Sequence, residues 1–85
     1  MVVVKRSPTL HGTLTVAPQP MSHTFTILST EKMLEGTEAV VIDMQGREVK
    51  RLIVRDGLQV EVKGWPVGMY LLRLADGSTV RLVKN

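Results

Sequence analysis

The segment PVGMYLLRLADGSTVRLVK, residues 66–84, contains the clearest structural pattern in the sequence. Apolar and polar side chains alternate around the pair Asp76-Gly77, with Leu72 in step before the pair and Val80 in step after it. Alternation with a period of two is typical of a half-buried strand. Asp and Gly suit a tight turn, because glycine accepts a positive φ and aspartate caps its own backbone. The segment therefore predicts a β-hairpin whose turn is formed by Asp76 and Gly77.

The same alternation recurs upstream of the hairpin. Phe25 and Ile27 alternate with threonines, and Val60 lies between two polar residues. A slip of one residue would reverse every face, so the strand register is well specified. Turn residues separate the strands at residues 43–46 and 56–57. Strands at a spacing of about ten residues, with polar turns and no helices, predict a β-sandwich.

Two segments depart from this pattern. Within residues 48–54 the apolar parity shifts midway, which indicates either a β-bulge near Lys50 and Arg51 or a strand buried on both faces. Residues 29–35 resemble a single helical turn with Ser29 or Thr30 as a cap. This turn is too short to pack as an independent helix, so we interpret it as a connection between strands.

The first residues are less regular. A run of three valines at residues 2–4 is followed by Ser7-Pro8, so this stretch is either an edge strand or a linker, and the linker interpretation is favoured. The chain is therefore divided into a leader at residues 1–14 and one β-sandwich domain at residues 15–85.

Composition restricts the possible partners. The net charge is +3, but the basic residues are scattered, and the densest group is interspersed with Glu48 and Asp56. Such mixed charge usually marks an ordinary solvated face. Nucleic-acid binding would require a basic stripe with exposed aromatic residues, and the chain has only one Phe, one Trp and one Tyr. Binding to an anionic surface is a weaker possibility. No apolar run approaches the length of about 20 residues that a membrane span requires.

Catalysis is not supported. The histidines His11 and His23 have no carboxylate at metal-ligand spacing, and the chain contains no cysteine. Asp43 precedes Met44-Gln45-Gly46, so capping a turn explains it better than catalysis. No serine lies in a nucleophile elbow, and there is no glycine-rich phosphate loop. We expect no enzyme activity, no metal and no cofactor.

Several residues have a structural interpretation. Pro18 and Pro20 flank one polar residue, which fixes an extended corner between strands. Gly68 allows a kink after Pro66, and Tyr70 is expected to pack in the core with its hydroxyl hydrogen-bonded. Trp65 is expected to cover the open end of the sandwich.

In this order, the segments resemble the C-terminal sorting domain of the type IX (Por) secretion system of Bacteroidetes. The family pattern VYPNP is similar to VAPQP at residues 16–20, and F-x-I is matched by FTI at residues 25–27. The turn YDxxGRxV resembles IDMQGREV at residues 42–49, which contains Asp43, Gly46 and Arg47. LxxGxYxLxL is matched by WPVGMYLLRL at residues 65–74, and the basic ending by VRLVK at residues 80–84. The departures are Ala17, Gln19 and Trp65 in place of an aromatic residue, Asn and Leu.

The resemblance implies an immunoglobulin-like β-sandwich of about seven antiparallel strands. It also implies that a cargo fused upstream reaches the periplasm through its own signal peptide and is directed by this domain to the outer-membrane translocon. A sortase-like protease then usually removes the domain at the cell surface and joins the cargo to lipopolysaccharide. Cleavage falls just before the domain, so residues 1–14 are expected to hold or follow the scissile bond.

Our main hypothesis is a recognition module in which the final hairpin presents a docking surface and a strand edge. The hairpin reaches to within one residue of the end of the chain, where we expect the export signal to lie. The residues assigned to partner recognition are Gly68, Tyr70, Arg73, Arg81, Val83 and Lys84. The alternatives are a carbohydrate- or surface-binding module that uses Trp65 and a structural spacer. Exchange of the valine-rich N-terminal strand would additionally allow a strand-swapped dimer.

Overall fold

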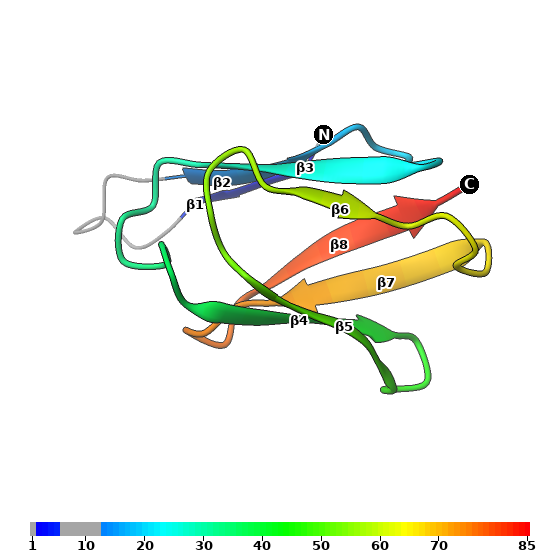
Figure 1. Ribbon diagram of the computed structural model, residues 1–85. Coiled ribbons are helices and arrows are strands. Elements are labelled where there is room, and N and C mark those ends of the chain that lie inside the picture. The colour runs from blue at the N-terminus through cyan, green and yellow to red at the C-terminus, as the bar shows by residue number, and fades with distance from the viewer. Residues whose placement is uncertain (1, 6–12) are drawn as a thin grey trace.

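The computed structural model describes residues 2–5 and 13–85, and this part of the chain consists of strands and turns without a helix (Figure 1). Eight strands form two sheets of four strands each. The strands are β1 (Val2–Lys5), β2 (Thr13–Ala17), β3 (Thr24–Ser29), β4 (Glu38–Asp43), β5 (Glu48–Ile53), β6 (Gln59–Glu61), β7 (Gly68–Arg73) and β8 (Thr79–Lys84). No helix in the described residues is long and apolar enough to cross a membrane.

The strand orders are β1-β2-β3-β6 in the first sheet and β5-β4-β7-β8 in the second, and all strand pairs are antiparallel. The two sheets lie face to face as separate layers (Figure 1). The chain crosses between the layers after β3, β5 and β6, so strands distant in the sequence become neighbours. This arrangement confirms the predicted immunoglobulin-like β-sandwich.

The eight strands agree with the predicted number of about seven, and one of them, Val2–Lys5, pairs with β2 as an edge strand. Of the two interpretations that the sequence left open for this run, the edge strand is the one that the structure contains. The first sheet also includes Thr13 and Leu14, which precede the boundary placed at residue 15. The sequence of so short a run of valines does not indicate whether it pairs with another strand.

The core lies between the sheets and takes one face of each strand. Phe25 and Ile27 of β3 face Val41, Leu72 and Leu82 of the second sheet, and all five side chains have no exposed surface. Burial of each such side chain contributes about 1.5–3 kcal/mol relative to exposure. The period-two alternation in the sequence therefore predicted the core face of these strands correctly.

The final hairpin is present as predicted. β7 and β8 pair along their full length, with Leu72 opposite Val80. The Asp76 carboxylate accepts the backbone N–H of Ser78 at 3.0 Å, and Gly77 has a φ of 89°. Asp76 caps the turn and Gly77 supplies the positive φ, as the sequence indicated.

The parity shift in residues 48–54 is a β-bulge. The register between β4 and β5 changes between Val41, which is opposite Lys50, and Ile42, which is opposite Glu48. Val49 is the extra residue, and its half-buried side chain packs against the core. The bulge turns Val49 inward, and it thus lies immediately before Lys50 and Arg51, the pair near which it was predicted.

Residues 29–36 form a turn between β3 and β4, which confirms the predicted connection. Ser29 caps it, since its Oγ accepts the backbone N–H of Glu31 at 3.1 Å. Leu34 is only 3% exposed and anchors the turn on the core.

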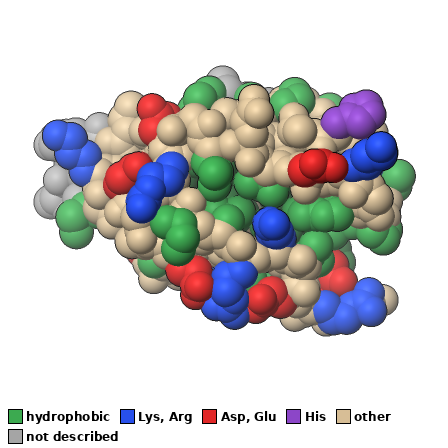
Figure 2. All heavy atoms as spheres, in the orientation of Figure 1, with side chains coloured by type: hydrophobic (Ala, Val, Ile, Leu, Met, Phe, Trp, Pro, Cys, Tyr) green, Lys and Arg blue, Asp and Glu red, His purple; other side chains and the backbone are tan. Residues whose placement is uncertain are grey.

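Along the side where β5 and β6 face the viewer, hydrophobic side chains reach the surface between the two layers (Figure 2). No strand pairing joins β5 to β6. A groove of about 410 Å³ lies there, with Leu52, Leu58 and Val60 among its lining residues and Lys50 and Glu61 also contributing. The sandwich is therefore open along this side.

Candidate recognition surface

Four segments that are distant in the sequence meet at one end of the sandwich, which we call the motif end. They are the corner at residues 18–21, the turn at 43–47, the loop at 64–68 and the terminal pair 84–85. Asp43 lies opposite Tyr70, and Gly68 lies opposite Lys84. Figure 1 shows the turn after β4, the loop before β7 and the C-terminus together at its right-hand end. The fold thus gathers the segments that carry the family-like motifs.

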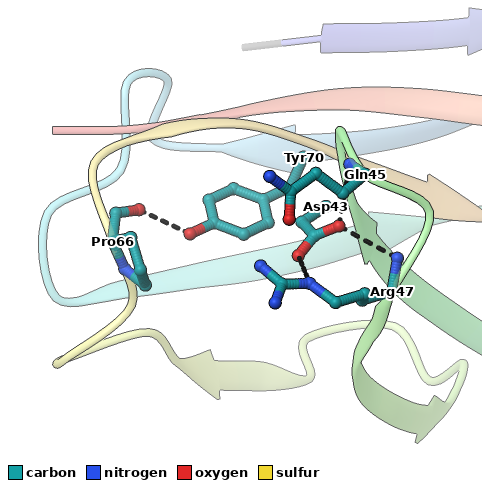
Figure 3. A network of polar contacts seen from close by, with 5 residues as sticks. All are labelled: Asp43, Gln45, Arg47, Pro66 and Tyr70. Atoms are coloured by element: carbon teal, nitrogen blue, oxygen red, sulfur yellow. Dashed lines mark hydrogen bonds and ion pairs between the residues drawn. The ribbon is translucent and has the colours of Figure 1, made fainter.

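Asp43 organises the turn between β4 and β5 (Figure 3). One carboxylate oxygen accepts the backbone N–H groups of Gln45 and Arg47, each at 2.9 Å. The other oxygen accepts the Arg47 Nε–H at 2.9 Å. The backbone N–H of Arg47 is the main cause of a pKa of Asp43 below its ordinary value, and the guanidinium of Arg47 adds to it. Asp43 is therefore a turn cap, as predicted, and Arg47 completes it.

Two glycines at the motif end need their special backbone conformation. Gly46 has a φ of 84° and Gly68 a φ of 151°, while a Cβ at either position would meet no atom within 4 Å. Space is thus available at both sites, and the backbone conformation is what excludes other residues. Gly46 closes the Asp43 turn, and Gly68 redirects the chain into β7.

Tyr70 is a buried residue at the same end. Its side chain is 4% exposed, and its hydroxyl donates a hydrogen bond to the carbonyl of Pro66 (Figure 3). The ring packs against half-buried Trp65 with a centroid separation of 5.3 Å and a tilt of 50°. Burial raises the pKa of the Tyr70 phenol, and the Asp43 charge raises it further. Both sequence expectations hold, because Tyr70 is a hydrogen-bonded core residue and Trp65 covers the end of the sandwich.

An open groove of about 400 Å³ runs across the motif end between the turn and the loop. Trp65, Tyr70 and Asp43 contribute to its walls. Met44 and Val67 line it as well and are 61% and 77% exposed. The groove presents apolar surface to solvent, and Arg47, whose side chain is 74% exposed, lies beside it.

The corner at residues 18–21 ties the first sheet to the last strand of the second. The Gln19 side chain donates from Nε2 to the Arg81 carbonyl at 3.0 Å and accepts the Val83 N–H at its Oε1 at 3.0 Å. Met21 continues the contact, because its N–H donates to the Val83 carbonyl at 2.8 Å and its carbonyl accepts the Asn85 N–H at 2.9 Å. The Gln19 side chain, which lies between two prolines, thus forms hydrogen bonds to β8 of the kind that the backbone of a neighbouring strand would form.

This clamp changes the predicted docking mode of the hairpin. The backbone hydrogen-bonding groups on the outer edge of β8 are already occupied at Arg81 and Val83 by Gln19 and Met21. β1 also lies close to β8. A partner strand cannot pair with this part of the edge unless the corner moves away, so the expected free strand edge is not found there.

The six residues assigned to recognition divide into three groups. Arg73 and Arg81 are exposed, whereas Gly68 and Val83 are half-buried. Tyr70 and Lys84 are 4% and 8% exposed, and the Lys84 Nζ donates to the carbonyl of Asn85 at 2.8 Å. Tyr70 and Lys84 therefore support the fold.

The motif residues lie at both ends of the sandwich. Pro18 and Pro20 form the corner at the motif end, where each follows a cis peptide bond. Asp76 and Gly77 lie in the turn between β7 and β8, away from the motif end. In the described residues no group of three His, Asp or Glu side chains is placed to hold a metal ion.

Sequence reasoning missed the role of Gln19, which had been treated as a departure from the family Asn. The flanking prolines were the available signal, since they leave no backbone N–H for a ladder and a side-chain amide supplies one instead. It also missed the exposed outer face of the second sheet, where Val40, Ile42 and Leu71 alternate with the core residues.

The structure defines an immunoglobulin-like sandwich whose distinguishing feature is the motif end. Residues 15–85 match the family model of the Secretion system C-terminal sorting domain, and the chain belongs to that family. No curated protein and no solved structure matches the chain.

Membership gives the domain its general role, that of a C-terminal sorting signal for type IX secretion. The family is not an enzymatic one. The role implies interaction with the type IX secretion system, a cargo fused to the N-terminal side, and export to the cell surface or outer membrane.

Proposed function

We propose that the outer-membrane translocon of the type IX system reads this domain as a folded unit. The observation that carries the proposal is the use of the motif residues in the fold. Asp43 caps a turn, Gly46 closes it, and Tyr70 anchors the loop at Pro66. Residues with these roles act only when the chain is folded, so a linear peptide would lose what they contribute.

In this proposal the cargo crosses the inner membrane first and the domain folds in the periplasm. The folded domain then docks on the translocon, and a sortase-like protease cleaves on the N-terminal side of the sandwich at the cell surface. Arg73 and Arg81, which are exposed, remain candidates for contact with the translocon. Tyr70 and Lys84 act indirectly by holding the motif end together.

The test is export of a folded reporter that carries a signal peptide at its N-terminus and the 85-residue chain at its C-terminus. A Bacteroidetes host with an intact translocon is compared with the same host lacking it. We expect reporter outside the cell only in the intact host. Retention of folded reporter in the periplasm of both hosts would contradict the proposal.

Deletion of β8 is a poor test of recognition. β8 contributes Val80 and Leu82 to the core, and these side chains are 1% and 0% exposed. Their removal would unfold the domain and abolish export whether or not the hairpin touches the translocon. Point substitutions at exposed positions separate the two effects.

The carbohydrate-binding alternative is not favoured. A stacking platform requires an exposed aromatic face, whereas Trp65 is half-buried and packs against Tyr70.

A further inference from the structure

The outer face of the second sheet carries an apolar strip. Core residues such as Val41 and Leu72 alternate with residues that point away from the core, and in most antiparallel sheets such outward positions are polar. Here six of them are apolar, namely Ile53 of β5, which is 45% exposed, and five residues on β4, β7 and β8. The strip consists of Val40, Ile42, Met69, Leu71 and Val83, of which Met69 is 39% exposed and the others are half-buried.

Strand register makes the strip continuous across three strands. Ile42 of β4 lies opposite Leu71 of β7, and Met69 lies opposite Val83 of β8. Directly opposed residues on one face have Cβ atoms about 4.5–5.5 Å apart, so these side chains touch or nearly touch.

The outer face of the first sheet is different. Its outward positions on β3 and β6 are Thr24, Thr26, Leu28, Gln59 and Glu61, with only one large apolar side chain among them. An apolar outer face is therefore a property of the second sheet alone among the side chains that the structure describes.

Positive charge borders the strip on the β7–β8 side. Arg73 lies opposite Val40, and Arg81 lies opposite Leu71. In the described part of the chain neither arginine has an ion pair, although Arg73 contributes to the low pKa of Glu48, whose main cause is a hydrogen bond from Arg51.

Charge on the β5 side is already compensated. Arg51 donates to both Glu38 and Glu48, at 2.5 Å in each case. The free positive charge of this face is thus concentrated along β7 and β8, where a carboxylate of a partner would meet it.

We propose that this strip and its two arginines form the surface by which the folded domain docks on a protein partner, one that offers an apolar patch bordered by carboxylates. An apolar centre with a polar rim, and the presence of Met and Arg, are typical of protein interfaces. The same face also carries the Glu38 and Glu48 carboxylates around Arg51, and such acidic groups fit a protein partner better than an anionic lipid surface, which would favour uniformly basic residues. The inference rests on the proposed function, because it assigns the face that the translocon contacts.

The experiment uses the same reporter fused to the full chain and compares charge reversals. Arg81→Glu and, separately, Arg73→Glu are compared with Lys32→Glu, an exposed lysine on the turn between β3 and β4. Leu71→Thr is compared with Leu28→Thr, whose side chain is 45% exposed on the other sheet. We expect the Arg81, Arg73 and Leu71 variants to lower export about tenfold or more. Like charges across an interface cost several kcal/mol in the two arginine variants, and Leu71→Thr removes apolar contact surface. Both controls should export normally, and thermal unfolding of each isolated domain identifies any variant that has lost its fold.

The outcomes separate the two proposals. If the unaltered domain is not exported, the proposed function fails. If it is exported and Arg81→Glu matches Lys32→Glu, the docking surface is wrong while the function stands. Sedimentation and binding to vesicles containing anionic lipid test the other occupants. Self-association or vesicle binding that only the strip variants lose would overturn the proposal in favour of a second copy or a membrane.

Discussion

At the scale of single residues, Asp43 links a sequence motif to a measurable property. Its carboxylate accepts two backbone N–H groups and the Arg47 Nε–H, and these contacts hold its pKa below the ordinary value of 3.8. A carboxyl whose pKa is lowered by folding stabilises the fold above its unfolded pKa, and this stabilisation is lost as the pH falls through the folded value.

We therefore expect Asp43→Asn to lower the melting temperature at pH 7, because the amide cannot form the ion pair with Arg47. The difference from the unaltered domain should shrink as the pH falls below about 4, where the carboxylate becomes protonated. Thermal unfolding between pH 7 and pH 2.5 measures this. Glu48, whose pKa is also lowered, titrates in both proteins and cancels from the comparison. A difference that stays constant with pH would show that Asp43 contributes only as an uncharged cap.

The roles of Asp43 and Tyr70 were predictable because each depends on its neighbours in the sequence. A carboxylate before a glycine turn caps that turn, and a tyrosine in step with leucines lies in the core. Lys84 was assigned to recognition on its charge. Its parity with Val80 and Leu82 already places it on the inner face, and the structure has it 8% exposed. At a strand end, parity was the better guide.

At the scale of elements, the corner between β2 and β3 is held to β8 by the Gln19 side chain. We expect Gln19→Leu, which removes both hydrogen bonds, to destabilise the domain by about 1–2 kcal/mol. Gln19→Glu keeps an acceptor for the Val83 N–H but sets a carboxylate against the Arg81 carbonyl, so it should also destabilise. Urea unfolding measures the stability, and amide hydrogen exchange at Val83 should accelerate in Gln19→Leu.

Gln59→Leu is the matched control for Gln19, because Gln59 is exposed on the outer face of β6. It should change stability by less than about 0.5 kcal/mol, as surface substitutions usually do. Unchanged exchange at Val83 in Gln19→Leu would mean that the backbone contacts of Met21 alone hold the corner.

Elements with a strong internal pattern were predicted well, and those defined by a distant partner were not. The hairpin of β7 and β8 and the bulge at Val49 both follow from local parity. The pairing of β1 with β2 and the clamp of Gln19 on β8 join segments whose partners lie elsewhere in the chain. The local sequence of either segment does not indicate its distant partner, so the outer edge of β8 was predicted to be unpaired.

At the scale of the whole molecule, the proposed recognition of the folded domain predicts that export depends on residues far from the final hairpin. Phe25 lies in the first sheet and has no exposed surface. Phe25→Ala should cost about 3–5 kcal/mol. For a domain of this size each kcal/mol lowers the melting temperature by about 4–8 °C, so a fall of more than about 12 °C is expected. Leu28→Ala, at a position 45% exposed on the same strand, is the control and should leave melting and export nearly unchanged.

Thermal unfolding of both variants is compared with reporter export at temperatures below and above the melting point of Phe25→Ala. If the translocon reads the fold, export of Phe25→Ala should fail only where the domain is unfolded. Full export of the unfolded variant would show that a linear C-terminal peptide suffices, since Phe25 lies more than 40 residues before the hairpin at residues 68–84.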